Sequence, residues 1–374
     1  MKKIGILTTY FATNFGAMLQ PFALLRTLQK KGFDVEMIRY GQAKVVEAYD
    51  PLSISKYKGK SIQYVLFRIA TLPIELLKQW RYRRYEKKYV CKKLSLQNDI
   101  EQNYDAYIVG SDQVWNPAVT GGFDDVYFGF FKAKSSSIKI SYAPSAETIP
   151  DTPQNREYLK KALENFDAIS VREATLKEDL MLLTGRADIS VVPDPTILAD
   201  PSVFDEIEKV SPPTNKRYVL FYRIRNSDQY LQTAIEYAKK KGAVLLLISA
   251  WIDPTITIFA IRNWRNVIFR PAIGPEQFLC AIRNAVAVFT PSFHGCVFSI
   301  IFHKQFFSPK CSSWNSRIEN LLAETGLKSQ LLLPKESASN TDINWTKVDE
   351  ALAAMRQRGH NFLDEALNPL MQQA

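Results

Sequence analysis

The sequence predicts an α/β protein with two Rossmann-like domains that face each other across a cleft. Short apolar runs that read as buried strands alternate with amphipathic helical stretches along most of the 374 residues, a pattern typical of parallel α/β sheets. The stretch SPPTNK at 211–216 separates an earlier series of these units from a later one and reads as a linker. A chain of this length is also too long for one comfortable core and suits two domains.

The first domain is predicted to span residues 1–205. It opens with a strand at 4–9, a helix at 15–31 that ends at Gly32, and a returning strand at 34–40. This βαβ unit is typical of doubly wound sheets, because consecutive parallel strands need a crossover connection. The same sheet is expected to continue with strands at 107–109, 138–142, 168–171 and 189–192.

The second domain is predicted to span residues 216–345. It begins with a strand at Tyr218, followed by a helix at 228–241 and strands at 243–249 and 266–270. The remaining residues, 346–374, are predicted to form a helical tail that crosses back to the first domain.

Residues 274–309 carry the most informative local pattern of the second domain. Gly274–Pro275 opens a short helix, AVAVFTPS at 285–292 reads as a buried strand, 293–295 reads as a tight corner, and CVFSIIFHK reads as a second helix. The corner then lies at the carboxyl end of a strand, the edge at which α/β sheets bind ligands. His294 is therefore expected at the mouth of a cleft, beside helix N-terminal amides.

Composition is ordinary for a globular protein, with 46% hydrophobic and 23% charged residues. No apolar run reaches the 18 or so residues of a membrane span. The apolar start, IGIL, is broken at once by Thr8 and Thr9, so it reads as a core strand and not as a signal peptide. The four cysteines lack C-x-x-C spacing, so neither a zinc site nor a disulfide framework is expected. We therefore expect a protein of the reducing cytoplasm.

Residues from about 43 to 103 are predicted to form a basic, helical insertion beside the first sheet. Much of the net charge of +10 lies at 78–93, where eight basic residues accompany one acid and four aromatic side chains. One interpretation is a solvated helix whose aromatic stripe packs on the domain. A second is peripheral contact with a membrane surface. Nucleic-acid binding is not expected, because no recognition motif accompanies the basic stretch.

Several motifs occur together in a fixed order. SFHG at 292–295, followed by VFSIIF, resembles the C-terminal signature of the polysaccharide pyruvyl transferase family. The similarity extends over most of the chain and includes segments from the first loop to the last third: Asn14–Phe15–Gly16–Ala17 with Leu19–Gln20, YDAYIVGSDQVWNP at 104–117, ISVRE at 169–173, PDPT at 193–196 and NSRIENLL at 315–322.

This resemblance implies a fold similar to the two-domain glycosyltransferase B arrangement. It also implies transfer of a pyruvate unit from phosphoenolpyruvate to two hydroxyls of one sugar, in a precursor of an exopolysaccharide or capsule, with formation of a cyclic ketal. The acceptor is expected to be a glycan or a lipid-linked sugar. Phosphoenolpyruvate is a co-substrate, and we expect no cofactor and no metal ion.

The catalytic candidates are His294, Arg172 and Asp112. His294 is assigned acid/base chemistry. Arg172 closes a predicted strand, so its guanidinium could fork onto the donor carboxylate or phosphate, or else pair with Glu173 or Asp194. Asp112 could accept protons or hydrogen bonds from sugar hydroxyls, or it could cap its own turn.

The remaining site candidates are assigned to one substrate each. The donor needs cations and amide groups, which predicts contacts from Arg223, Arg225, Lys310, Arg317, Ser292 and Gly295. Lys304 is the alternative to Lys310. The acceptor is assigned the loop residues Asn14, Gly16 and Gln113, and Trp115, whose flat face suits a sugar ring although a large aromatic residue often belongs to the core.

One position departs from the family pattern. Some members carry an arginine two residues before the motif histidine, where this sequence has Ser292. Donor contacts would then come from Arg172, Arg225 or Lys310. Two other functions remain open, a glycosyltransferase that uses a nucleotide sugar and a non-catalytic carbohydrate-binding descendant of the family.

Overall fold

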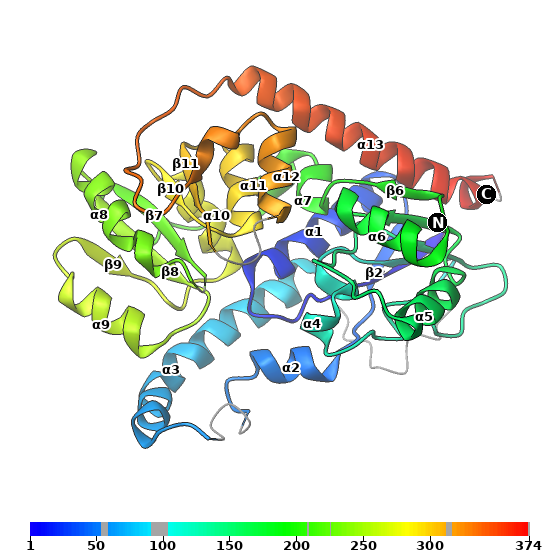
Figure 1. The fold of residues 1–374 in the computed structure, drawn as a ribbon, viewed down its shortest axis with the longest axis horizontal. Coiled ribbons are helices and arrows are strands. Elements are labelled where there is room, and N and C mark those ends of the chain that lie inside the picture. Colours follow the sequence, from blue (N-terminus) through cyan, green and yellow to red (C-terminus); the bar gives the residue numbers. More distant parts are fainter. Residues whose placement is uncertain (54–58, 91–103, 208, 225, 312–315, 373–374) are drawn as a thin grey trace.

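The computed structural model describes residues 1–53, 59–90, 104–207, 209–224, 226–311 and 316–372. Two six-stranded parallel sheets form the cores of two domains (Figure 1). The strands of the first sheet, from edge to edge, are β2 (Asp34–Met37), β1 (Lys3–Leu7), β3 (Ala106–Val109), β4 (Ile138–Ser141), β5 (Ala168–Val171) and β6 (Ile189–Val191). Those of the second are β12 (Leu331–Leu332), β11 (Phe306–Pro309), β10 (Val288–Phe289), β7 (Tyr218–Arg223), β8 (Val244–Ser249) and β9 (Val267–Phe269).

The strand orders fix where ligands can bind. In the first sheet the direction of chain progression reverses between β1 and β3, and in the second sheet between β7 and β10. Loops on either side of such a switch point diverge to opposite faces of the sheet and leave a crevice at the carboxyl ends of the strands. Each domain therefore offers one crevice of this kind.

Helices cover both sheets and connect their strands (Figure 1). Those of the first domain and its insertion are α1 (Phe15–Lys30), α2 (Ala43–Tyr49), α3 (Ile62–Tyr85), α4 (Pro117–Thr120), α5 (Pro153–Leu163), α6 (Ala174–Thr184) and α7 (Pro195–Leu198). Those that follow are α8 (Leu231–Lys240), α9 (Pro254–Arg262), α10 (Pro275–Arg283), α11 (Phe293–Ile301), α12 (Ser316–Glu324) and α13 (Trp345–Met371). None of the described helices combines the length and the apolar character that a membrane crossing requires.

Aromatic packing joins the two domains. Phe15, the first residue of α1, stacks on Phe278 of α10 with ring centroids 4.1 Å apart and also meets Tyr222 of β7 at 5.2 Å. Phe15 is 1% exposed and belongs to a hydrophobic cluster with members in both domains. Because a buried phenylalanine contributes roughly 1.5–3 kcal/mol, this contact stabilises one relative placement of the domains.

The insertion also bridges the domains. Near the C-terminal end of α3, the Lys78 ammonium group donates to the carbonyl of Ala250 at 2.7 Å, and Arg81 donates to the carbonyl of Ala272 at 2.8 Å. Tyr82 and Tyr85 are buried in the hydrophobic cluster that both domains share. The aromatic residues of the basic stretch at 78–93 therefore have different environments. Tyr82 and Tyr85 are buried, whereas Trp80 is 54% exposed.

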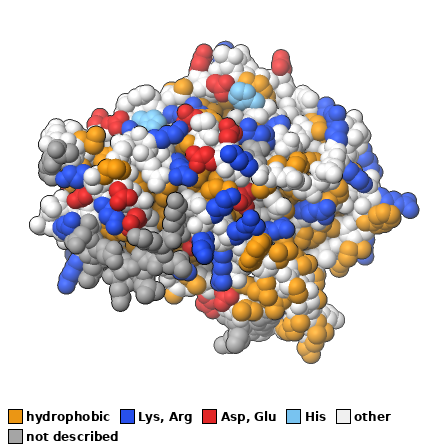
Figure 2. All heavy atoms as spheres, turned by 180° about the vertical axis from the view of Figure 1, so that it is seen from behind, with side chains coloured by type: hydrophobic (Ala, Val, Ile, Leu, Met, Phe, Trp, Pro, Cys, Tyr) orange, Lys and Arg blue, Asp and Glu red, His pale blue; other side chains and the backbone are white. Residues whose placement is uncertain are grey.

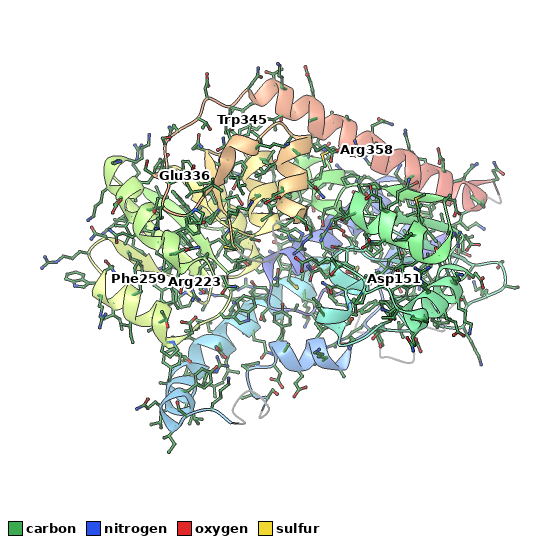
Figure 3. The ribbon with its side chains drawn as sticks, in the orientation of Figure 1. Asp151, Arg223, Phe259, Glu336, Trp345 and Arg358 are labelled. Atoms are coloured by element: carbon green, nitrogen blue, oxygen red, sulfur yellow. The ribbon has the colours of Figure 1, made fainter. Side chains whose placement is uncertain are left out.

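Helix α13 returns from the second domain to the first. It begins where Trp345 stacks on His303 with centroids 4.7 Å apart, and it then passes over α7 along the top of the molecule in Figure 3. On the first domain, Phe362 meets Tyr142 and Asp364 pairs with Lys31 at 2.5 Å. The helix therefore acts as a second connection between the domains.

The segment around His294 differs from its prediction. Strand β10 covers only Val288–Phe289, and the predicted corner at 293–295 is the first turn of α11. Ser292 caps this helix, because its hydroxyl accepts the Gly295 amide at 3.3 Å. A serine with extended backbone geometry is a favoured N-cap, and the helix therefore starts earlier than the sequence indicated.

Candidate active site

A cavity of about 610 Å³ lies between the domains. Its walls come from loops that follow β1 and β3 in the first domain and β7, β8, β10 and β11 in the second. Both switch-point crevices therefore open into one space. The insertion adds a further wall through Val45, Ala48 and Tyr49 of α2.

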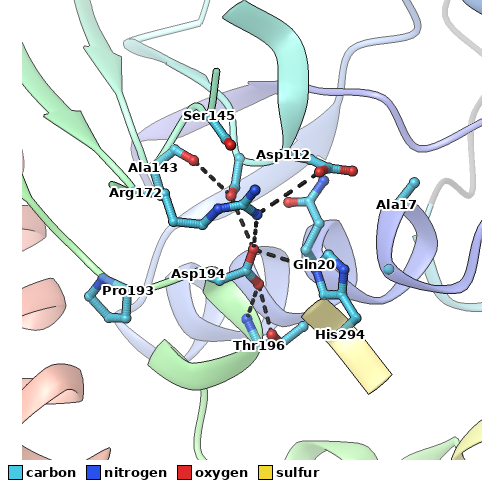
Figure 4. Close-up of polar contacts among 12 residues, drawn as sticks. Ala17, Gln20, Asp112, Ala143, Ser145, Arg172, Pro193, Asp194, Thr196 and His294 are labelled. Atoms are coloured by element: carbon cyan, nitrogen blue, oxygen red, sulfur yellow. Dashed lines mark hydrogen bonds and ion pairs between the residues drawn. The ribbon is translucent and has the colours of Figure 1, made fainter. Parts of the chain in front are cut away.

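His294 lies in the first turn of α11 and lines this cavity. Its side chain is largely buried, and the ring is fixed on two sides by the first domain (Figure 4). Nε2 is buried and lies 3.5 Å from Oδ2 of Asp194. The Nδ1 edge lies against Gly16, where an added Cβ would stand 1.9 Å from Nδ1. The histidine of one domain is thus oriented by two residues of the other.

Asp194 is the anionic partner of His294. It caps α7 and is 1% exposed, with Oδ1 accepting from the Thr196 amide at 3.0 Å and from its hydroxyl at 2.7 Å. Oδ2 accepts from Arg172 at 2.8 Å. Although burial alone would raise the pKa of Asp194, the neighbouring His294 and Arg172 hold it well below its usual range. Asp194 is therefore a carboxylate across the physiological pH range. The sequence indicated Asp194 only as a possible ion-pair partner of Arg172, and Asp194 was not among the predicted site residues.

Arg172 is buried beneath the site and is engaged by carboxylates (Figure 4). Nε donates to Glu173 at 2.8 Å, Nη1 donates to Asp194, and Asp112 lies 3.9 Å away. The guanidinium also stands 4.7 Å from the ring of Phe293. It lines a smaller cavity of about 50 Å³ and not the large one. The prediction that Arg172 reaches into the cleft is therefore wrong, because its carboxylate partners hold it in place as a positioning residue.

Arg317 supplies the positive charge that faces the cavity. It comes from the first turn of α12 and meets Gln113 of the first domain. With the Gln113 amide turned so that its oxygen faces the guanidinium, this oxygen accepts from Nη2 at 2.8 Å and from Nη1 at 2.9 Å. Burial, followed by the charge of Arg172, lowers the pKa of Arg317, while Glu173 and Asp112 oppose this shift. A guanidinium at the cavity wall can bind the anionic group of a ligand.

Asp112 lines the cavity from the loop after β3. Its φ of 68° lies in a region that non-glycine residues rarely adopt. The loop is held in place by backbone contact with the segment after β4, since the Ser145 amide donates to the Asp112 carbonyl at 2.8 Å. The Asp112 side chain is about one-fifth exposed and makes no capping hydrogen bond to its own turn. The carboxylate therefore pairs with Arg172 and also reaches the cavity lining, where a ligand can meet it.

Two helix N-termini also face the cavity. Asn14 caps α1 and accepts from the Gly16 amide at 2.9 Å, while Ser292 caps α11. Asn14, Ala17, Ser292 and Phe293 all contribute to the lining. The first turns of helices present unpaired N–H groups and positive partial charge, and both properties suit an anionic ligand.

Three of the predicted donor contacts are wrong. Arg223 is nearly buried within the second domain (Figure 3), where Asp228 accepts at 2.5 Å and Asp253 accepts at 2.7 Å. The Lys310 ammonium group lies 3.3 Å from Glu319 and is absent from the lining. Gly295 is packed on Thr290, since a Cβ would stand 2.6 Å from its hydroxyl oxygen. Arg225 lies outside the described residues.

Two of the predicted acceptor contacts are also wrong. Trp115 is 0% exposed, stacks on Phe128 and donates its indole N–H to the Tyr127 carbonyl at 2.8 Å. It is a core residue, because packing on both faces leaves none for a sugar. Gly16 provides room for the His294 ring and not for a ligand. Asn14 and Gln113 do line the cavity.

Sequence reasoning missed the aromatic side chains that do reach the cavity. Trp251, in the loop after β8, is 38% exposed and lines the second-domain wall, and Tyr49 lines the wall formed by the insertion. The available signal for Trp251 was a large aromatic residue immediately after a buried strand. Within the described part of the chain, no group of three or more His, Cys, Asp or Glu side chains is arranged to hold a metal ion.

Comparison with known proteins gives a family match and several fold matches. The family model described as polysaccharide pyruvyl transferase matches residues 14–308. No curated protein sequence matches the chain. Among solved structures, the UDP-GlcNAc 2-epimerase from Neisseria meningitidis bound to UDP-GlcNAc is similar, with 12% identity, full coverage of both chains and a TM-score of 0.51.

Two further solved structures are more distant. The UDP-N-acetylglucosamine 2-epimerase from Rickettsia bellii has 12% identity, a TM-score of 0.49 and coverage of 100% of this chain and 96% of its own. The E. coli heptosyltransferase WaaC with ADP-2-deoxy-2-fluoro heptose has 12% identity, a TM-score of 0.43 and coverage of 95% and 99%. At identities this low, the similarity to these structures concerns the fold alone. That fold is the two-domain arrangement similar to glycosyltransferase B.

Proposed function

This chain belongs to the polysaccharide pyruvyl transferase family, a family of transferases, and we propose that it moves a pyruvate unit from phosphoenolpyruvate to a sugar of a surface-polysaccharide precursor. The product is a cyclic ketal, and inorganic phosphate is released. The observation that carries this proposal is the buried pair of His294 and Asp194, with 3.5 Å between Nε2 and Oδ2, at the wall of an interdomain cavity.

The reaction defines what the site must do. The methylene carbon of the donor gains a proton and becomes a methyl group, while C2 becomes an oxocarbenium-like centre. Two sugar hydroxyls form bonds to C2, and the C2–O bond to phosphate breaks. Of the two hydroxyl protons, one balances the proton gained by the methyl group and the other leaves with the phosphate. A positioned acid/base group and a site for departing negative charge are therefore needed.

His294 suits the acid/base role because its two nitrogens face different surroundings. Nε2 points to the Asp194 carboxylate, and the Nδ1 edge lies at the cavity wall beside Gly16. A carboxylate next to one ring nitrogen fixes the orientation and the tautomer of the ring, as in other histidine–carboxylate pairs. In the proposed mechanism, Nδ1 exchanges protons with the substrates and Asp194 acts through His294.

Arg317 and the two helix N-termini support binding of the anionic donor. Phosphoenolpyruvate carries a phosphate and a carboxylate, and a guanidinium can bind either group through two parallel hydrogen bonds. In the proposed arrangement, Arg317 and the first turn of α11 hold the donor and stabilise the leaving phosphate. Ser292 adds a hydroxyl to this wall.

Trp251 and Asp112 support binding of the sugar on the remaining walls. An exposed indole face packs well on the apolar face of a sugar ring, and a carboxylate accepts hydrogen bonds from hydroxyls. Both residues line the cavity. We place the reaction in the cytoplasm, where the buried free thiols of Cys280, Cys296 and Cys311 would stay reduced.

The direct test combines phosphoenolpyruvate with a panel of nitrophenyl and lipid-linked sugars in D₂O. We expect release of phosphate, together with a product that is heavier than the acceptor by one pyruvate less one water and carries one deuteron in the new methyl group. The variant His294→Gln should give neither, while Lys310→Gln should retain both. Turnover with a nucleotide sugar and none with phosphoenolpyruvate would instead support the glycosyltransferase alternative. Sugar binding without any turnover would support a non-catalytic protein.

A further inference from the structure

Helix α3 has an inverted distribution of polarity. Its solvent-exposed side carries a continuous apolar stripe, in which Ile62 is 79% exposed, Leu66 60% and Ile69 58%. The residues of the stripe follow one another at intervals of three or four, which places them on one face of the helix. We name this set the α3 stripe: Ile62, Leu66, Ile69, Pro73, Leu77 and Trp80.

The opposite side of α3 is buried and polar. Arg68 and Glu75 form an ion pair there, and Thr71 is buried beside them. Lys78 is 6% exposed, and this burial lowers its pKa to about 8. A helix that only needed to pack on a soluble protein would place apolar residues inward and charges outward. Burial of charges is costly unless they are paired, and the helix accepts this cost on its inner face while its apolar side chains remain outside. This inverted pattern indicates that the outward apolar face has a partner.

Basic residues continue the stripe at its C-terminal end. Arg84 and Lys87 follow Trp80 at intervals of four and three, and Arg83 and Lys88 flank them; all four side chains are exposed. The Arg84 guanidinium lies 5.5 Å from the Trp80 ring. Figure 2 shows the apolar side chains gathered on the protrusion at the lower edge of the molecule, with Lys and Arg side chains above it. The partner must therefore be apolar along most of the helix and negatively charged near its end.

We propose that α3 docks this protein on the surface of an anionic lipid bilayer, with the α3 stripe inserted among the lipids and the four basic residues on the headgroups. An interfacial helix has this combination of an apolar face, a tryptophan at the boundary and cationic side chains. The charge complementarity distinguishes a bilayer from a second copy of this basic chain, which would bring like charges together. The stripe extends over roughly 27 Å, from 1.5 Å per residue, and therefore offers a long line of contact.

Docking through α3 would place the cavity close to the bilayer. The connection from α2 leads into α3, and α2 forms one wall of the cavity through Val45, Ala48 and Tyr49. Lys78 of α3 also holds the Ala250 carbonyl, adjacent to Trp251 at the opposite wall. Entry of a lipid-linked sugar from the membrane into this cavity rests on the proposed function. Docking of α3 on the bilayer does not.

The test is flotation of the full-length protein with vesicles of phosphatidylglycerol and phosphatidylcholine, compared with phosphatidylcholine alone. We expect binding to the anionic vesicles and a loss of at least about 150-fold in the double variant Leu66→Ser, Ile69→Ser, because each buried aliphatic side chain contributes roughly 1.5–3 kcal/mol. The double variant Arg84→Ser, Lys87→Ser should lose about 30-fold, at roughly fivefold for each charge. High salt should also weaken the binding of the wild-type protein to anionic vesicles, because it screens the charges.

Matched controls remove similar side chains elsewhere. Leu182 on α6 is 69% exposed, and Leu182→Ser should leave binding unchanged. The pair Lys239→Ser, Lys240→Ser removes two adjacent exposed charges from the end of α8 and should also have no effect. Thermal unfolding confirms that each variant is folded. No binding to anionic vesicles, or equal loss in the control variants, would overturn the proposal. A dimer that dissociates only in the stripe variant, without vesicle binding, would assign the stripe to a second copy instead.

This test is independent of catalysis, because vesicle binding needs no substrate. With a water-soluble acceptor, the stripe variant should keep the activity of the wild type. Failure to bind vesicles with intact turnover would overturn only the docking proposal, while binding without turnover would count only against the proposed reaction.

Discussion

Gly16 and His294 meet across the domain boundary, so closely that a Cβ added at Gly16 would stand 1.9 Å from Nδ1 of the histidine. Gly16 belongs to the first turn of α1 and His294 to the first turn of α11. The imidazole is therefore held between this backbone and the Asp194 carboxylate. Orientation of the proposed acid/base group thus depends on the first domain.

Gly16→Ala should lower kcat by about 100-fold, because the added methyl group displaces the imidazole and misplacement by about 1 Å has an effect of this size. The KM for phosphoenolpyruvate should change little. Steady-state kinetics measure both constants. Gly41→Ala is the matched control, since its Cβ would meet only the Val46 side chain, at 3.1 Å. Wild-type kcat in Gly16→Ala would show that the ring position is not critical.

His294→Gln should reduce kcat by about 10²- to 10⁴-fold, which is the usual contribution of a general acid or base, while donor binding is retained. Asp194→Asn should also lower kcat and, in addition, destabilise the fold by about 3–5 kcal/mol, since Arg172 loses a buried partner. Kinetics and chemical denaturation separate the two effects. Donor binding is followed by the thermal shift with phosphoenolpyruvate. Equal destabilisation by both variants would contradict the separate roles.

Arg317→Gln should raise the KM for phosphoenolpyruvate by about 10- to 100-fold, because charge-assisted hydrogen bonds contribute roughly 1.5–3 kcal/mol. The KM for the acceptor should be nearly unchanged. Initial rates at varied donor concentration measure the effect. Lys310→Gln is the comparison, as its ammonium group lies on Glu319 outside the cavity lining. A larger effect in Lys310→Gln than in Arg317→Gln would place the donor elsewhere.

Trp251→Ala should raise the KM for the acceptor sugar by about 10-fold through loss of the exposed indole face, with an unchanged melting temperature. Trp115→Ala should behave in the opposite way. Its buried ring leaves a large cavity, so the free energy of unfolding should fall by about 3–5 kcal/mol. Acceptor titrations and denaturation curves test the pair. Destabilisation by Trp251→Ala without a change in KM would assign that residue to packing.

Lys78 should make stability increase with pH. Its pKa is lowered by burial to about 8 in the folded protein, against about 10.4 in an unfolded chain. Between these values the unfolded chain binds more protons, so raising the pH favours folding, by about 3 kcal/mol in total. The difference in unfolding free energy between wild type and Lys78→Met should shift in favour of wild type from pH 8 to pH 10. For the exposed Lys88→Met, the corresponding difference should stay constant.

The strands and most helices could be predicted because their signals are local. The run at 218–223 is apolar and lies between turn residues, and β7 occupies it. The start of α11 was predicted too late, and the reason is also local. Serine is favoured both in turns and at helix N-caps, so Ser292 alone does not distinguish the two. In the site, the position of His294 at a carboxyl edge followed from the strand–helix order alone.

Which side chains from distant segments contact each other could not be predicted in the same way. Arg172 could have reached the cleft or paired with Glu173 or Asp194, and both carboxylates hold it. Trp115 and Trp251 both follow strands closely, yet only Trp251 lines the cavity. These outcomes depend on which surfaces from distant segments meet, and no spacing along the chain encodes that.

By itself, the sequence determined the order of strands and helices, the two-domain α/β fold and the family, because periodicity and ordered motifs are properties of neighbouring residues. Only the tertiary structure decided that Gly16 makes room for His294, that Asp194 is its partner, and that the apolar side of α3 faces outward. The physical reason is the same in each case. A 3.6-residue period defines the faces of a helix but not which face becomes buried, and contacts between domains exist only after both have folded and packed together.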